Sequence, residues 1–108
     1  MDLDELRNLT NEGQNAVKTR VSPVAKQIVD KILRKLESEA PSQAREGKNY
    51  VSVKIDTLEN FRSVRKEEEV DLFVMVGDLL REKNKNISIE PEYRIGVGYG
   101  YIKASMSW

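Results

Sequence analysis

The C-terminal segment, residues 87–108, constrains the fold more than any other part of the chain. Within it, three glycines alternate with bulky residues in the run Gly96-Val97-Gly98-Tyr99-Gly100. A turn at Gly98-Tyr99 gathers a set of apolar side chains on one face, namely Ile95, Val97, Ile102, Ala104, Met106 and Trp108. Glycine at the first central position of a two-residue turn suits a tight hairpin, because it adopts the required backbone shape without strain. The segment therefore predicts a hairpin centred on residues 98–99.

A further strand precedes this hairpin. Ile87-Ser88-Ile89 has the alternation of a strand, and Pro91-Glu92-Tyr93 fits a three-residue loop. That register sets Ile89 opposite Ile95. The chain is thus predicted to close with a three-stranded antiparallel meander.

Two helices are predicted at the N-terminus. Residues 3–19 repeat leucine at helical spacing, although Gly13 weakens the pattern. Ser22-Pro23 is a typical helix start, because serine caps free amides and proline at the first position loses no hydrogen bond. A further stripe predicts a helix over residues 23–38: Val24, Ala25, Ile28, Val29, Ile32, Leu33 and Leu36. Pro41 is expected to end this helix or to restart a short turn through Arg45, with Gly47 as a stop.

The middle of the chain predicts a strand and a third helix. Residues 50–55 alternate strictly between apolar and polar side chains, as a half-buried strand does. Residues 66–83 fit a strand through Val70, Leu72, Val74 and Val76. They also fit a helix whose inner face holds Val70, Phe73, Val74, Gly77 and Leu80. Its outer face then holds Glu67, Glu68, Asp71, Asp78 and Arg81. We predict the helix, because acids cluster at its start and bases at its end.

These elements predict an α+β fold in a single domain, residues 1–108, with the helices on one face of a small sheet that includes residues 50–55. Residues 1–20 are expected to form a peripheral or partly disordered helix. No apolar run reaches the roughly 20 residues of a membrane span, and the first residues are acidic where a secretory signal is basic. A location in the cytoplasm, or in a virion for a virus-encoded protein, is therefore expected.

Composition argues against several kinds of chemistry. The chain has no cysteine and no histidine, which excludes disulfides, thiol nucleophiles and zinc sites built from those residues. Residues 96–100 lack a Gly-Lys-Ser/Thr and precede a predicted strand, so they do not fit a phosphate-binding loop. Glu67-Glu68-Glu69 fans out around a helix and cannot converge on one cation. We predict no catalytic residues, no metal, no cofactor and no small-molecule substrate.

The best candidates for nucleic-acid contact are six bases in residues 18–35, because a basic helix can follow phosphates: Lys18, Arg20, Lys26, Lys31, Arg34 and Lys35. Lys26 and Arg34 are each one turn from Asp30, which predicts ordinary intrahelical pairs. Lysine and arginine total 18, equal to the acids, so net charge gives no long-range attraction. A solvated helix face is the competing interpretation.

The candidates for protein contact are Tyr99, Tyr101, Lys103 and Trp108, since tyrosine is favoured at interfaces. Alternatively, the Tyr101 ring covers the bare backbone of Gly96. Trp108 is expected to pack under the helices or into a neighbouring subunit.

The layout of a helix, Gly47-Lys48 before a Val-x-Val strand, a further helix and a final strand ending in Ser107-Trp108 resembles many small proteins of phages and large DNA viruses. No residue role follows from this resemblance. The sequence favours a non-catalytic interaction or structural module that binds a protein partner or itself, through the first helix or the sheet edge. The alternative is a nucleic-acid-associated accessory protein that uses residues 18–35.

Overall fold

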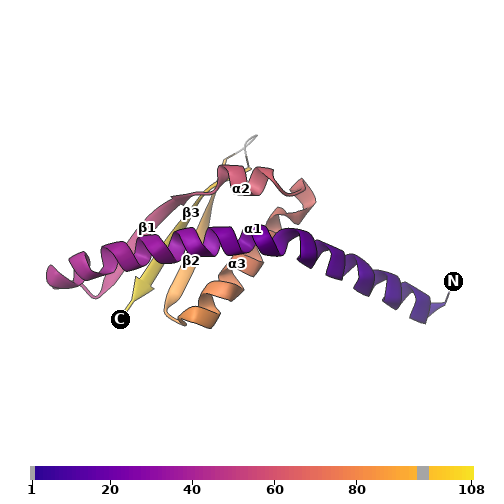
Figure 1. Cartoon of the computed structure of the whole chain (residues 1–108), viewed down its shortest axis with the longest axis horizontal. Helices are drawn as coiled ribbons and strands as arrows, with labels where there is room; N and C mark the ends of the chain where they lie inside the picture. Colours follow the sequence, from indigo (N-terminus) through magenta and orange to yellow (C-terminus); the bar gives the residue numbers. More distant parts are fainter. Residues whose placement is uncertain (1, 95–97) are drawn as a thin grey trace.

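A computed structural model of the chain describes residues 2–94 and 98–108. In chain order its elements are α1 (Leu3–Arg45), β1 (Tyr50–Asp56), α2 (Leu58–Arg62), the 3-10 helix η1 (Lys66–Glu68), α3 (Glu69–Lys83), β2 (Ile87–Arg94) and β3 (Gly98–Ser107). A long N-terminal helix thus precedes a small antiparallel sheet (Figure 1). The predicted α+β class is confirmed.

The N-terminal half of the chain forms one helix, so the prediction of two helices separated before Pro23 is wrong. Asp2 caps this helix, since its Oδ1 accepts a hydrogen bond of 2.8 Å from the amide of Glu5. Val21 is fully buried just before the proline, and Ala25 is fully buried just after it. The ring of Pro23 is on the exposed side, where water can bond to the carbonyl that proline leaves without a helical partner. The buried side chains before and after Pro23 therefore keep the helix continuous through the proline.

Gly47 ends α1, as predicted, but the predicted end or restart at Pro41 is wrong, because α1 continues through this proline to Arg45. The φ of Gly47, 83°, lies in the left-handed region that glycine adopts without strain. The amides of Gly47 and Lys48 donate back to the carbonyls of Ala44 and Gln43, at 3.0 and 3.1 Å. These bonds satisfy carbonyls that the last helical turn leaves free.

The sheet has the order β1-β3-β2, with β3 antiparallel to both neighbours. β1 therefore runs parallel to β2, and α2, η1 and α3 form the connection between them. Residues 50–55 form a strand of this sheet, as predicted. The central strand is the last one in the chain.

The predicted register of the C-terminal segment is wrong. Gly98 and Tyr99 belong to β3 instead of a turn, and residues 91–93 belong to β2 instead of a loop. Ile89 is opposite Ala104, whereas its predicted partner Ile95 is outside the described residues, as are Gly96 and Val97. Pro91 is tolerated within β2 because β2 is an edge strand with one side free of ladder bonds.

Residues 69–83 are helical, which confirms the choice of helix over strand. The inner face differs from the predicted one, because Leu72 and Val76 are fully buried while Val70 and Val74 are more than half exposed. Glu68, predicted to be outside, is buried at 3% exposure. The helix is thus rotated so that a different stripe faces the core.

The core lies between the helices and one face of the sheet. α1 packs on β1 and on α3, and α3 packs on β2. Alternate residues of the strands point into this layer, and residues between them point away from it. The core comprises Val21, Ala25, Ile28, Val29, Ile32, Leu36, Val51, Val53, Ile55, Phe61, Leu72, Val76, Leu80, Ile87, Ile102 and Ala104. The predicted stripe of residues 25–36 and the packing of helices on one sheet face are confirmed.

The longest dimension of the molecule, 63 Å, is close to the length of α1 itself, about 64 Å at 1.5 Å per residue. Figure 1 shows α1 crossing the sheet and continuing well past it toward the N-terminus. We call residues 3–16, all of which are exposed, the overhang, and the rest of the described chain the body. Among the described residues, no helix combines the length and apolar character needed to cross a membrane.

Candidate functional site

The six predicted basic residues lie on two different sides of α1. At 100° per residue, Arg20, Lys31, Arg34 and Lys35 fall on one flank, and Lys18 and Lys26 fall on the other. In the described chain no ion pair joins Asp30 to Lys26 or Arg34, so the predicted intrahelical pairs are wrong. The structure does not bring the six bases together as one surface.

Three of these bases are held by the body. Lys31 Nζ donates to Asn60 Oδ1 at 2.8 Å, and Lys35 Nζ donates to the Lys54 carbonyl at 3.2 Å. Arg20 donates through Nε and Nη2 to Glu68 Oε1, at 3.0 and 2.6 Å. These contacts fasten α1 to α2, β1 and η1, so the three side chains have structural partners.

Lys31, Arg34 and Lys35 also line a shallow groove of about 520 Å³ between α1 and β1. Lys54 adds a fourth base to this groove, and Glu39 and Asp56 add two acids. Because two acids lie beside its four bases, the groove lacks the uniformly positive character of a phosphate-binding surface.

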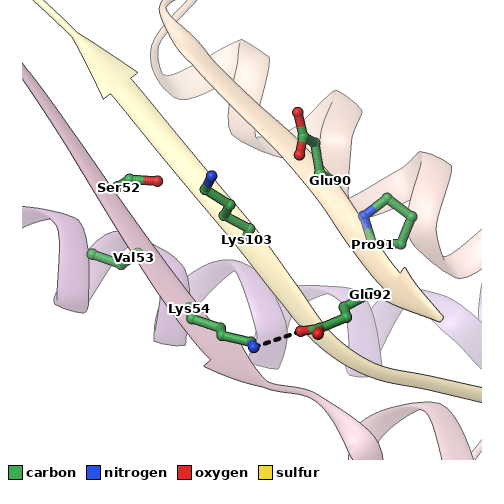
Figure 2. Close-up of a pocket in the computed structure, with 7 residues that line it drawn as sticks. All are labelled: Ser52, Val53, Lys54, Glu90, Pro91, Glu92 and Lys103. Carbon is green, nitrogen blue, oxygen red and sulfur yellow. Dashed lines mark ion pairs between the residues drawn. The ribbon is translucent and has the colours of Figure 1, made fainter. Parts of the chain in front are cut away.

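The outer face of the sheet, away from the helices, is polar. Lys54 on β1 reaches over the central strand to Glu92 on β2, with Nζ and Oε2 2.6 Å apart (Figure 2). The Lys54 ammonium lies 4.6 Å from the centre of the Tyr101 ring, and this cation–π geometry holds the ring against the sheet. Lys54 and Glu92, together with Glu90 and Lys103, line an open hollow of about 500 Å³ (Figure 2).

Among the predicted protein contacts, Tyr101 and Lys103 are alternate residues of β3 on the outer face of the sheet, and their use as a contact patch stays a prediction. Tyr101 is engaged by Lys54, and Tyr99 is opposite Tyr93 in the β2–β3 pairing. Trp108 follows the other end of β3, about 23 Å from Tyr101 at 3.3 Å per residue. Its side chain is 48% exposed and its amide donates to the Asn49 carbonyl at 3.0 Å, so the prediction that it packs under the helices is wrong. Packing of Trp108 into a neighbouring subunit stays a prediction.

The overhang carries the most exposed leucines of the molecule. Leu3, Leu6 and Leu9 have exposed fractions of 69%, 47% and 53%. By helical spacing, Leu3 has the same phase as Val21, Leu6 lies about 40° beyond Ile28 at the edge of the buried stripe, and Leu9 lies about 60° further round the helix. The apolar stripe of α1 is thus covered in the body and uncovered in the overhang.

A groove of about 800 Å³ opens where the overhang leaves the body, between α1 and α3; we call it the α1/α3 groove. Its apolar lining comes from Val17 and Val21 on α1 and from Val74 and Met75 on α3. A Cβ built on Gly13, which also lines it, meets no atom within 4 Å. The groove is therefore open above Gly13.

Charged side chains edge the α1/α3 groove on both walls. Lys18 and Arg20 lie on the α1 wall, and Asp71 and Asp78 lie on the α3 wall. Asp78 is paired with Arg81 at 3.0 Å, and Arg20 is paired with Glu68. In the described chain, neither Lys18 nor Asp71 forms an ion pair.

Residues 67–69 do not form a cation site. Glu68 points into the body toward Arg20, away from its exposed neighbour Glu67. Over the described residues, no three acidic side chains are grouped closely enough to hold a metal ion.

The sequence contains a signal for the overhang but none for Glu68. The leucine spacing of residues 3–19 predicts an apolar stripe, which lies beside the stripe of residues 25–36 and overlaps its edge. Glu68 is far from Arg20 in the chain and looks like any acid at a helix start. Only the fold brings the two residues together.

Comparisons with family models, with curated proteins and with solved structures find no match.

Proposed function

We propose that the protein is a non-catalytic interaction module that self-associates through the overhang. The observation that carries this proposal is the continuity of the α1 stripe, which is buried from Val21 to Leu36 and exposed at Leu3, with the exposed Leu6 at its edge. Burial of one leucine side chain contributes about 1.5–3 kcal/mol. A second protein surface over the overhang would gain this contribution from both leucines.

Self-association is favoured over capture of an unrelated protein because the chain supplies both parts of an interface. The overhang presents an uncovered apolar stripe, and the α1/α3 groove beside it presents an uncovered apolar floor. In a pair of identical chains related by a two-fold axis, each chain contributes one overhang and one groove, so both parts occur twice in the interface.

The nucleic-acid alternative stays a prediction. Arg20, Lys31 and Lys35 have partners within the body, whereas in the described chain Lys18, Lys26 and Arg34 form no side-chain hydrogen bond or ion pair. Binding to a random-sequence duplex at low salt tests this alternative. For a module of either kind we propose a place in the cytoplasm, or in the virion of a virus that encodes it; fractionation of the producing cell or particle tests that location.

Light scattering after size exclusion, over a concentration series, tests self-association. We expect the mass to rise from the monomer value of 12.4 kDa toward twice that value. The double change Leu3→Ser with Leu6→Ser is expected to lower the dimer fraction at every concentration, because it removes the uncovered stripe.

The matched control is Leu9→Ser, which removes a leucine of similar exposure from another side of the same helix. It is expected to leave the dimer fraction unchanged. A wild-type mass of one chain at all concentrations contradicts the proposal, and so does an equal loss of dimer in the control.

A further inference from the structure

We infer that the α1/α3 groove of one copy receives the overhang of a second copy, which runs antiparallel to the α1 that lines the groove. This inference rests on the proposed self-association and assigns its surface and its direction. The resulting dimer is symmetric, because each copy supplies one overhang and one groove.

The apolar side chains of the two parts match in this direction. With residue 11 of each α1 at the two-fold axis, Leu3 of one copy is level with the interval between Val17 and Val21 of the other. Leu6 is then level with the interval between Gly13 and Val17. The open space above Gly13 accepts a leucine side chain, and Val74 supplies the opposite wall.

Charge selects the antiparallel direction. Asp2 and Arg20 are separated by about five turns of α1, and Asp4 and Lys18 by about four, so each pair lies on one side of the helix. In the antiparallel dimer Asp2 therefore lies beside Arg20 of the second copy, and Asp4 lies beside Lys18. A parallel pair would instead place Asp2 and Asp4 beside their own equivalents.

The other charges of the groove do not reverse this preference. Asp71 and Asp78 are on the α3 wall, and Asp78 already has Arg81 as its partner. Arg7 is the one base among the acids of residues 2–12, and it faces the groove on the same side as Leu3. It brings a positive charge to the wall that carries Asp71.

The absence of cysteine from the chain makes disulfide trapping a direct test. Chains with Leu6→Cys and chains with Val17→Cys are mixed in a glutathione buffer and separated on a non-reducing gel. We expect the mixed disulfide to form about tenfold faster than in the control mixture of Leu9→Cys with Val17→Cys, since a disulfide needs Cα atoms within about 7 Å. A parallel dimer would instead link Leu6→Cys chains to each other.

A charge exchange gives a second, independent readout. Lys18→Glu is expected to raise the dissociation constant of the dimer about fivefold. Adding Asp4→Lys to the same chain is expected to restore the affinity, because the two charges exchange places across the interface.

The outcomes separate this inference from the proposed function. If light scattering shows a dimer but Leu6→Cys chains link to each other, or the charge exchange fails to restore affinity, self-association stands and the antiparallel seating is overturned. If light scattering shows one chain at every concentration, both proposals fall.

Discussion

The two halves of α1 share one helix and one apolar stripe, yet they differ in what lies beneath that stripe. In the body the stripe from Val21 to Leu36 is covered by the sheet and by α3. In the overhang the stripe at Leu3, with Leu6 at its edge, faces solvent. Spacing in a sequence therefore specifies which side of a helix is apolar, and only the three-dimensional arrangement specifies whether that side is covered.

The body also explains why the overhang is helical. An isolated helix of its length is marginal in water, because the first turn is costly to form. Here the body fixes the following turns, so the overhang needs only propagation, which is less costly per residue. The Asp2 cap and the exposed Asp4–Arg7 ion pair add small contributions at its start.

The largest expected effect separates the covered stripe from the uncovered one. Ile28→Ala is expected to lower the free energy of unfolding by about 3–4 kcal/mol, because Ile28 is fully buried and a cavity remains. Leu6→Ala is expected to change it by less than about 0.5 kcal/mol in the monomer. Urea unfolding of both variants at low protein concentration measures the difference. Equal losses would show that the overhang is covered within one chain.

The next effect concerns the junction of the two halves, where Arg20 fastens α1 to η1. Arg20→Met is expected to lower the free energy of unfolding by about 2–3 kcal/mol, because it leaves the buried Glu68 carboxylate without its partner. Combining it with Glu68→Gln is expected to recover part of the loss. The same urea titrations check both variants, and an unchanged midpoint in Arg20→Met contradicts the assignment.

A smaller effect distinguishes bases held by the body from a base that is not. Lys31→Met is expected to cost about 1–2 kcal/mol, because it leaves the amide of Asn60, a buried residue, with one partner fewer. Lys26→Met, on the exposed outer side of α1, is the control and is expected to cost less than about 0.5 kcal/mol. Thermal or urea unfolding measures both, and equal costs would remove the distinction.

The smallest effect lies within the overhang. Gly13→Ala is expected to stabilise the monomer by up to about 1 kcal/mol, because alanine is the better helix former and no atom lies near the added methyl group. The same change is expected to weaken the dimer, since it fills the space opposite Leu6 of the second copy. Helix content by circular dichroism and dimer mass by light scattering are measured on the same samples. A tighter dimer would contradict the place given to Gly13.

Much of the fold could be predicted from local patterns. The stripe of residues 25–36, the strand of residues 50–55 and the stop at Gly47 are confirmed, because each depends on neighbouring residues alone. The break before Pro23 was predicted wrongly, because tertiary burial outweighs the proline signal there. The strand register was also wrong, because β1 and β2 both pair with β3, and this pairing is not local.

The interaction surfaces were less predictable. The basic residues could be listed from the sequence, but the partners of Lys31 and Lys35 come from α2 and β1 and leave no local trace. The inner face of α3 was assigned from spacing that two faces fit almost equally well. Val74 was therefore expected in the core, whereas it lines the α1/α3 groove.

The central position of β3 has a consequence for synthesis. Among the described residues, β1 and β2 each pair with β3 and with no other strand, so neither can form this ladder until the ribosome has passed Gly98. Up to that point the nascent chain holds helices with two solitary strands, whose unpaired amides are open to other chains. Any interruption of translation before β3 should therefore yield a product that aggregates or recruits chaperones.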